Sequence, residues 1–332
     1  FLLVNLGSPA STSVPDVKKN LDLFLMDPYV IDLPWPVRRI LVSLILSKRP
    51  AESAEAYKLI WWPEGSPLIE ISRQLRDKVR PLWNKGPVEL GMRYAQPSIE
   101  EAVLALVAQG ATTIVLAPLY PQFADSTTTT AIQETQRILN KHQLNIELKT
   151  LPAFYADELY LDSLIASTAE GMQQEFDHLL LSFHGIPERH IKKRDPSGSH
   201  CFSSPNCCAE ASGDVLANCY RAQCFKTAEA FAKRAGLSPE QWSVSFQSRL
   251  GRTKWIDPYT EDQLDTLAKQ GVKKLLVMSP AFVADCIETL EELGIRGREQ
   301  FLAAGGESLE LLPCLNDHDT WAQALVQMCE AL

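Results

Sequence analysis

The chain has 332 residues, of which 45% are hydrophobic, and its formal net charge at pH 7 is −9. A chain of this length exceeds what one hydrophobic core usually organises, so we expect two domains. The negative charge argues against a nucleic-acid partner, because binding a phosphate backbone needs a basic surface. No apolar run is long enough for a transmembrane helix. We expect a cytoplasmic protein, and since the sequence does not begin with Met, a leader before Phe1 is left open.

Short apolar runs recur along the chain. They lie at residues 1–6, 88–92, 113–117 and 146–151, and again at 178–183, 242–246, 274–278 and 309–312. Amphipathic segments such as 98–109, 127–139, 226–235 and 262–269 separate most of them. This alternation is typical of buried parallel strands connected by helices. The sequence therefore predicts two sets of four strands.

The two sets also resemble each other in sequence. LLVNLGSP from Leu2 parallels LLLSFHGIP from Leu179, and IVLAPLYPQFAD from Ile114 parallels LLVMSPAFVAD from Leu275. Such a repeat predicts an α/β protein of two Rossmann-like domains, each a four-stranded parallel sheet flanked by helices, with the substrate in a cleft between them. We place these domains at residues 1–152 and 153–315, followed by a C-terminal helix at 316–332 that is free to pack back on the first domain. Neither half has a GxGxxG turn or a P-loop, so no nucleotide is predicted.

Residues 21–50 differ in character from the rest of the first domain. The segment LDLFLMDPYVIDLPWPVRRILVSLILSKRP is rich in large apolar residues, contains three prolines and ends in Lys48 and Arg49. Prolines interrupt core helices, and a basic end suits lipid headgroups. We expect an apolar lip that receives a hydrophobic ligand and makes peripheral contact with a membrane. The alternative is a helix buried in its own domain.

Carboxylates follow one of the apolar runs. In GVKKLLVMSPAFVADCIETLEEL, from Gly271, we expect a helix to begin near Ala284. Asp285, Glu288 and Glu292 then recur at helical spacing and share one face, with Glu291 beside them. A solvated face whose first turn favours acids is the alternative.

A histidine ends another of these runs. His184 is followed by a glycine and, two residues later, a proline. Open parallel sheets bind ligands at the carboxyl ends of their strands. We therefore expect His184 and Glu288 at the same edge of a sheet.

Seven stretches carry a family resemblance. They are NLGSP from Asn5, EGSPL from Glu64, GMRYAQPSIEEA from Gly91, YPQFADSTTT from Tyr120, LSFHGIP from Leu181, FQSRLGRTKWIDPYT from Phe246 and FVADCIETLEEL from Phe282. Together, and in this order, they resemble the ferrochelatases, the enzymes that insert ferrous iron into protoporphyrin IX to form protohaem. The resemblance covers nearly the whole chain and implies two Rossmann-like domains flanking a porphyrin cleft.

The resemblance also implies roles for single residues. His184 and Glu288 match the catalytic histidine and glutamate, which are also expected to meet the substrate iron. Asp285 and Glu292 extend the acidic row thought to move metal or protons. The porphyrin contacts are expected at Leu6, Arg93, Tyr94 and Trp255. This chain has Cys286 where many members have histidine, and Leu6 where some have methionine.

These residue types suit metal insertion, in which two pyrrole protons leave the porphyrin. An imidazole can accept a proton near neutral pH, and a carboxylate can bind ferrous iron or relay the second proton. Which group is the base and which holds the iron stays open. The alternatives are a cobalt chelatase acting on another tetrapyrrole and a carrier of tetrapyrrole or metal without turnover. A homodimer is left open.

Five of the eight cysteines lie between Cys201 and Cys224. In a chain this large, such clustering is typical of a metal site and of a reducing compartment. Compared with family members that lack a cluster, residues 196–224 look like an insertion, as in some bacterial members. The resemblance implies a 2Fe-2S cluster held by Cys201, Cys208, Cys219 and Cys224, with Cys207 as the alternative to Cys208. A zinc ion held by four cysteines is the competing interpretation.

Overall fold

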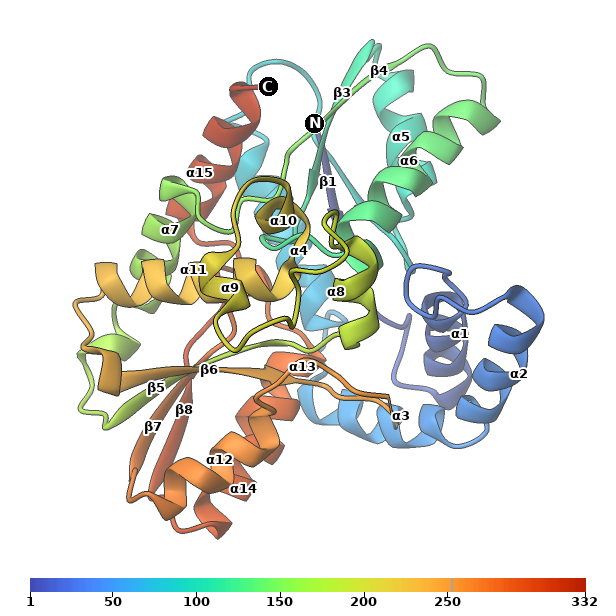
Figure 1. Ribbon diagram of the computed structural model, residues 1–332. Helices are drawn as coiled ribbons and strands as arrows, with labels where there is room; N and C mark the ends of the chain where they lie inside the picture. Colours follow the sequence, from blue (N-terminus) through green and yellow to red (C-terminus); the bar gives the residue numbers. More distant parts are fainter. Residues whose placement is uncertain (252) are drawn as a thin grey trace. The chain divides into compact units, whose positions relative to one another are not determined.

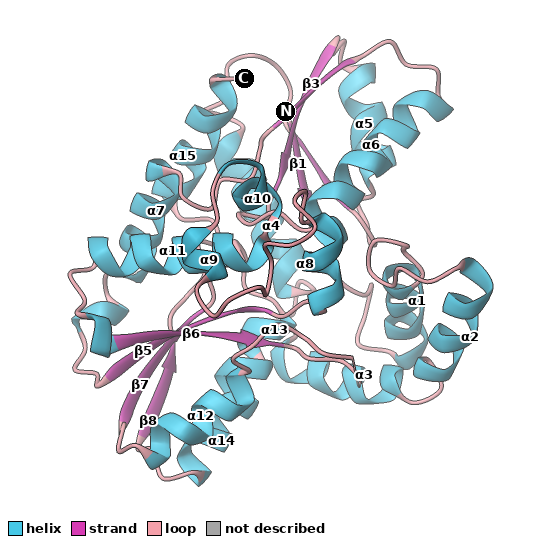
Figure 2. Ribbon diagram, viewed as in Figure 1, coloured by secondary structure: helices cyan, strands magenta, loops and turns pink. Residues whose placement is uncertain are grey.

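A computed structural model describes residues 1–251 and 253–332. The chain divides into two compact units, which are described separately. Unit 1 comprises residues 1–120, 124–152 and 322–332, and unit 2 comprises residues 121–123 and 153–321. Each unit contains one four-stranded sheet accompanied by helices (Figure 2). The prediction of two sets of four strands is confirmed.

The sheet of unit 1 is entirely parallel, with the strand order β2-β1-β3-β4. Its strands are β1 (Leu2–Asn5), β2 (Glu89–Met92), β3 (Thr113–Pro118) and β4 (Glu147–Thr150). All four residues of the central strand β1 are buried. This burial explains why β1 is a continuous apolar run, since both faces of a parallel sheet are covered.

Helices cover both faces of this sheet. They are α1 (Val14–Leu25), α2 (Trp35–Ile45), α3 (Arg49–Ile60), α4 (Pro67–Val79), α5 (Ile99–Ala108), a π-helix η1 (Asp125–Thr129), α6 (Thr130–Lys141) and most of α15 (Asp319–Glu330). The side chains of α5 and α6 pack with β1 and β3 in one apolar core. On α4, Ser72 accepts a hydrogen bond from the Asn5 amide, 3.3 Å away.

The sheet of unit 2 has the order β6-β5-β7-β8 and is also entirely parallel. Its strands are β5 (His178–His184), β6 (Trp242–Gln247), β7 (Lys274–Met278) and β8 (Ser308–Leu311). Taken in chain order, these strands occupy the same positions as those of unit 1. The shared order is the structural counterpart of the sequence repeat.

Helices also surround the second sheet. They are α7 (Glu158–Thr168), η2 (Gly171–Gln173), α8 (Glu188–Arg194), α9 (Cys207–Glu210), α10 (Gly213–Asn218), α11 (Tyr220–Arg234), η3 (Pro239–Gln241), α12 (Thr260–Lys269), α13 (Ile287–Leu290), a π-helix η4 (Glu292–Gly297) and α14 (Arg298–Ala303). On one face, α12 and α14 pack on the strands through Leu264, Leu267 and Phe301, and α11 lies over the other (Figure 1).

Residues 21–50 form the end of α1, all of α2 and the first residues of α3. A small apolar cluster holds them together, with Leu25, Ile31, Val42 and Leu46 buried. The opposite side of α2 is exposed, with 62% of Trp35, 65% of Ile40 and 67% of Leu44 accessible to solvent. The segment is therefore neither fully buried nor polar on its outer face. In the described residues, no helix is both long and apolar enough to cross a membrane.

Candidate active site

His184 ends strand β5, and the strand fixes where its ring lies. The residues before it on β5 are buried, whereas His184 itself is half-buried. Its Nδ1 atom lies 2.6 Å from the carbonyl oxygen of Gly185. Because a carbonyl only accepts hydrogen bonds, Nδ1 carries a proton, so in the neutral ring the lone pair is on Nε2. His184 can therefore accept a proton at Nε2.

The backbone around His184 is closely packed. Tyr220 donates its hydroxyl to the His184 carbonyl at 2.9 Å. A Cβ atom on Gly185 would lie 2.8 Å from the Gln247 carbonyl oxygen and 3.3 Å from the Trp255 ring. Trp255 is half-buried and donates its indole N–H to the Leu250 carbonyl at 2.9 Å. Only glycine fits at 185, so the Trp255 ring packs directly beside the residue that follows His184.

The acidic segment begins its helix later than the sequence predicts. The expected start near Ala284 is wrong, because Cys286 is still extended, with φ −148°, and α13 begins at Ile287. Asp285 precedes the helix, and its carboxylate accepts hydrogen bonds from Thr289 at 2.9 Å and from Asn316 at 2.7 Å. Asp285 is therefore a buried group at the helix start and does not share a helical face with Glu288 and Glu292.

Glu292 lies near both His184 and Glu288 in unit 2. Burial raises the pKa of the Glu292 carboxyl above its ordinary value, and both His184 and Glu288 are close enough to act on it electrostatically. Both carboxylates are half-buried, so the interpretation of this segment as a solvated face is wrong. The Gln247 side chain donates to the Glu288 backbone carbonyl at 2.6 Å, which ties the helix to the end of β6.

Ser248 holds the Glu292 carboxylate at both oxygens. Its backbone N–H donates to Oε1 at 2.8 Å and its hydroxyl donates to Oε2 at 2.6 Å. Ser248 has a φ of 66°, in the left-handed region that is costly for residues other than glycine. This conformation points both donors at one carboxylate.

Cys286 and Glu291 lie close to Glu288 in sequence but make different contacts. Burial raises the pKa of the Cys286 thiol well above its ordinary value, and a hydrogen bond to Glu288 contributes in the same direction. Cys286 is therefore a neutral thiol beside Glu288. Glu291 is buried and accepts a hydrogen bond from Arg296 at 2.7 Å, so it is occupied by an ion pair.

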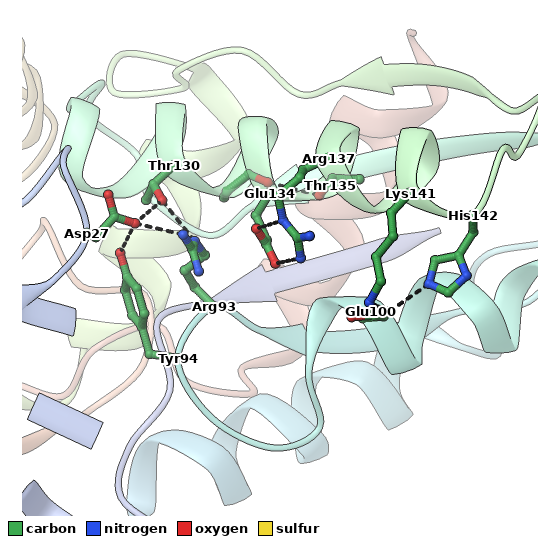
Figure 3. A network of polar contacts seen from close by, with 11 residues as sticks. Asp27, Arg93, Tyr94, Glu100, Thr130, Glu134, Thr135, Arg137, Lys141 and His142 are labelled. Atoms are coloured by element: carbon green, nitrogen blue, oxygen red, sulfur yellow. Dashed lines mark hydrogen bonds and ion pairs between the residues drawn. The ribbon is translucent and has the colours of Figure 1, made fainter. Parts of the chain in front are cut away.

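In unit 1, Arg93 and Tyr94 follow strand β2 and share one buried partner (Figure 3). The Arg93 guanidinium and the Tyr94 hydroxyl both donate to Asp27, at 2.7 and 2.9 Å. Arg93 also lies over the Tyr94 ring, 4.6 Å from its centroid. Leu6 follows β1, is half-buried and packs against the core of this unit. Arg93, Tyr94 and Leu6 thus come together at the carboxyl ends of β1 and β2.

Four of the clustered cysteines line one small pocket in unit 2. They are Cys201, Cys207, Cys208 and Cys219, and the other lining residues are Ile191, His200, Phe202 and Arg221. Cys224 does not line it; this residue is fully buried on α11, where burial raises the pKa of its thiol well above the ordinary value. Over residues 1–251 and 253–332, no group of three or more His, Cys, Asp or Glu side chains is positioned to hold a metal ion.

Hydrogen bonds reach two of the pocket sulfurs. Arg221 donates to the Cys208 sulfur at 3.2 Å, and the Ala222 N–H donates to the Cys219 sulfur at 3.5 Å. Burial raises the pKa of the Cys201 thiol to about 11, so this thiol is protonated at neutral pH without a metal. Four sulfurs with such donors are a chemically suitable set for an iron-sulfur cluster or zinc.

Sequence reasoning missed two residues that hold the functional groups. Asp27 lies in the apolar segment and gave no signal, because its partners are distant in sequence. Ser248 lies inside a recognised motif, and the left-handed backbone that gives it a role is not visible in the sequence.

Solved structures share this fold. SirB from Bacillus subtilis, described with Fe3+, superposes with a TM-score of 0.52 at 14% identity, over 80% of this chain and 91% of that one. The sirohydrochlorin chelatase SirB from subspecies spizizenii, in complex with cobalt, gives 0.52 at 14% identity, over 79% and 88%. Two parallel sheets with the same strand order therefore define a two-domain α/β protein with the fold that these chelatase structures share.

Comparison by sequence is more specific. The family model described as Ferrochelatase matches residues 1–332. A ferrochelatase of Stutzerimonas stutzeri is 66% identical over 99% of this chain and 96% of its own length. A ferrochelatase of Azotobacter vinelandii is 64% identical over 99% and 97%. The chain belongs to the ferrochelatase family.

Proposed function

We propose that His184 and Glu288 carry out the insertion of ferrous iron into protoporphyrin IX, the reaction that membership of the ferrochelatase family assigns to this chain. The observation that carries the proposal is the His184 ring, oriented by the contact of its Nδ1 with the Gly185 carbonyl, beside the half-buried Glu292 carboxylate, which is itself close to Glu288. His184 accepts a pyrrole proton, because its Nδ1 is already protonated. Glu288 meets the iron or takes the second proton, and it is a hard oxygen donor suited to a divalent cation.

Glu292 and Asp285 have different parts in this proposal. Ser248 fixes Glu292, whose pKa is raised by burial, so this carboxylate holds a proton more readily than an exposed glutamate does. Asp285 already accepts hydrogen bonds from Thr289 and Asn316, so it supports the start of α13. The acidic path therefore runs through Glu288 and Glu292, with Asp285 behind them.

We further propose that Leu6, Arg93, Tyr94 and Trp255 contact the porphyrin. Leu6, Arg93 and Tyr94 lie at strand ends, where open sheets bind ligands. Trp255 offers a half-buried aromatic ring next to Gly185. Apolar side chains of this kind bind the hydrophobic rim of a macrocycle, and that binding can favour a bent porphyrin whose nitrogens are open to metal.

A comparison of metals and tetrapyrroles separates this function from cobalt chelation. The protein is offered ferrous iron or cobalt, each with protoporphyrin IX or with sirohydrochlorin, under anaerobic conditions. We expect the highest kcat/KM for ferrous iron with protoporphyrin IX. A higher value for cobalt with sirohydrochlorin would assign the chain to the other reaction.

The exposed face of α2 supports a peripheral membrane contact, proposed here for the inner face of the cell membrane. Ile40→Ser with Leu44→Ser should weaken binding to vesicles of anionic phospholipid by about tenfold or more, since each side chain carries apolar area into the interface. Sedimentation with the vesicles measures the effect. Leu104→Ser, on α5, is the matched control and should not change binding. If the double variant bound the vesicles as well as the unmodified protein does, α2 would be an ordinary surface helix without a membrane contact.

We also propose that the cysteine pocket holds a 2Fe-2S cluster, with ligands drawn from Cys201, Cys207, Cys208 and Cys219. What supports it is the lining of one pocket by these four sulfurs. When bound, such a cluster supplies one-electron chemistry. The purified protein should be reddish-brown, and its visible absorption should bleach with dithionite.

Substitutions identify the ligands. Cys207→Ser and Cys219→Ser should each remove the colour, whereas Cys224→Ser should keep it, because Cys224 lies outside the pocket. Loss of colour in Cys224→Ser with retention in Cys207→Ser would restore the set predicted from the sequence. Colourless anaerobic protein that contains zinc, but neither iron nor acid-labile sulfide, would replace the cluster by a zinc site.

A further inference from the structure

Asp27 is a buried carboxylate on which three side chains converge. Only 1% of its side chain is exposed. Its Oδ2 atom accepts hydrogen bonds from Arg93 at 2.7 Å, from the Tyr94 hydroxyl at 2.9 Å and from Thr130 at 2.6 Å (Figure 3). Its Oδ1 atom accepts the backbone N–H of Tyr29 at 2.8 Å. Both carboxylate oxygens are therefore engaged.

These contacts fix the Arg93 side chain as well. Its Nε donates to the Thr130 hydroxyl at 2.8 Å, while Nη2 is bound to Asp27. The side chain is 19% exposed, so part of the guanidinium can still meet a ligand. Asp27 thus sets where the cation lies.

The charges around Arg93 are balanced. Besides Asp27, the Arg93 charge acts on the carboxylate of Glu134. That carboxylate is bound to Arg137 by two hydrogen bonds of 2.8 Å (Figure 3). Two carboxylates therefore face two guanidinium groups. The Asp27–Arg93 pair is the more buried of the two, so its balance is less screened by solvent.

From this arrangement we infer that Asp27 is a specificity-determining positioning residue: by neutralising and holding Arg93, it makes this surface suit a porphyrin with few carboxylates. The inference rests on the proposed function, in which Arg93 and Tyr94 contact the porphyrin. When an amide replaces the carboxylate, its oxygen can still accept the hydrogen bond that holds Arg93, but the positive charge of the guanidinium is no longer compensated. The uncompensated Arg93 charge then attracts a macrocycle with additional carboxylates more strongly than it attracts protoporphyrin IX.

The fold should tolerate the change from carboxylate to amide. Asn20 donates to the Tyr94 carbonyl at 3.1 Å, and Phe24 contacts the Tyr94 ring edge-on with 5.4 Å between centroids. These contacts hold α1 to the end of β2 independently of the Asp27 charge. Asp27→Asn keeps the shape and, at the position of Oδ2, the acceptor oxygen for Arg93, while it removes the charge and the acceptor of the Tyr29 N–H.

The test compares the binding of two porphyrins, protoporphyrin IX and the tetracarboxylate coproporphyrin III, by fluorescence titration. In Asp27→Asn, the ratio of the two affinities should shift by about fivefold toward coproporphyrin III, the factor expected for one partly screened ion pair. The same shift should appear in the ratio of the KM values, with kcat much less affected. Thermal unfolding shows whether each variant is folded.

Two further variants separate charge from structure. Thr130→Val removes a hydrogen bond from the same carboxylate without changing any charge, and its affinity ratio should stay that of the unmodified protein. Asp27→Asn with Arg93→Gln removes both charges and should return the ratio close to the original value.

An equal loss of affinity for both porphyrins in Asp27→Asn would overturn the inference, as would the same shift in Thr130→Val or in the double variant. The binding ratio does not depend on turnover. If the unmodified protein bound both porphyrins but inserted no iron, the proposed function would fail while the titrations still decided the part of Asp27.

Discussion

His184→Ala is expected to abolish metal insertion while leaving the protein folded and able to bind porphyrin. The substitution removes Nε2, which carries the lone pair of the neutral ring because Nδ1 donates to the Gly185 carbonyl, and with it the proposed acceptor of the pyrrole proton. General-base catalysis of this kind contributes about 10²- to 10⁴-fold to a rate. Turnover should fall by at least the lower figure, with the affinity for protoporphyrin IX nearly unchanged.

The same strand offers a matched control. His178 begins β5, and its ring lies 2.8 Å from the Ser243 hydroxyl. His178→Gln should lose some stability and keep its turnover per folded molecule. Partial recovery of His184→Ala in added imidazole would support proton transfer at this position. Near-normal turnover of His184→Ala would remove His184 from the mechanism.

Glu288→Gln should lower turnover far more than Glu291→Gln. Glu288 lies close to Glu292, on which His184 also acts, and the change to an amide removes its charge, its metal-binding capacity and its proton-accepting capacity. We expect a loss of about 100-fold or more, on the scale of a removed acid or base. Steady-state kinetics with ferrous iron as the varied substrate measures it.

Glu291→Gln is the control on the neighbouring position. Its carboxylate is bound to Arg296, whose side chain is 60% exposed. Losing this pair should cost about 1 kcal/mol of the free energy of unfolding and leave kcat unchanged. Equal kinetic defects in the two variants would mean that charge anywhere on this segment, and not the place of Glu288, supports the reaction.

Much of the fold was predictable because its strands are buried on both faces. The run from Leu179 to Phe183 has no polar side chain except Ser182, and a parallel strand covered by helices needs this pattern. The sequence repeat also predicted that the two halves of the chain have the same topology. Strand ends were less well predicted: β1 stops at Asn5, one residue before the apolar run does.

The site was predictable only where single motifs carry it. His184 and Glu288 were singled out by their places after apolar runs and by the family resemblance. The place of Asp285 was missed because its hydrogen bond with Asn316 competes with the helix, and that contact joins segments far apart in sequence. The role of Asp27 depends on tertiary contacts, and that of Ser248 depends on a left-handed backbone conformation. Neither feature produces a pattern that can be recognised in the sequence.

The cysteine cluster shows the same limit. Spacing alone did not separate Cys207 from Cys208 or exclude Cys224. In the structure, Cys224 is buried on α11 and is not among the residues that line the pocket. Burial and helix direction become visible only when the chain is folded.

The most direct test is an anaerobic assay of ferrous iron and protoporphyrin IX with far less protein than porphyrin, followed by visible absorbance. We predict that the free-porphyrin bands convert to those of protohaem over many turnovers per protein molecule, and that His184→Ala does not convert them. Absorbance changes that stop at one equivalent of porphyrin per protein, without formation of protohaem, would contradict the account and identify a carrier.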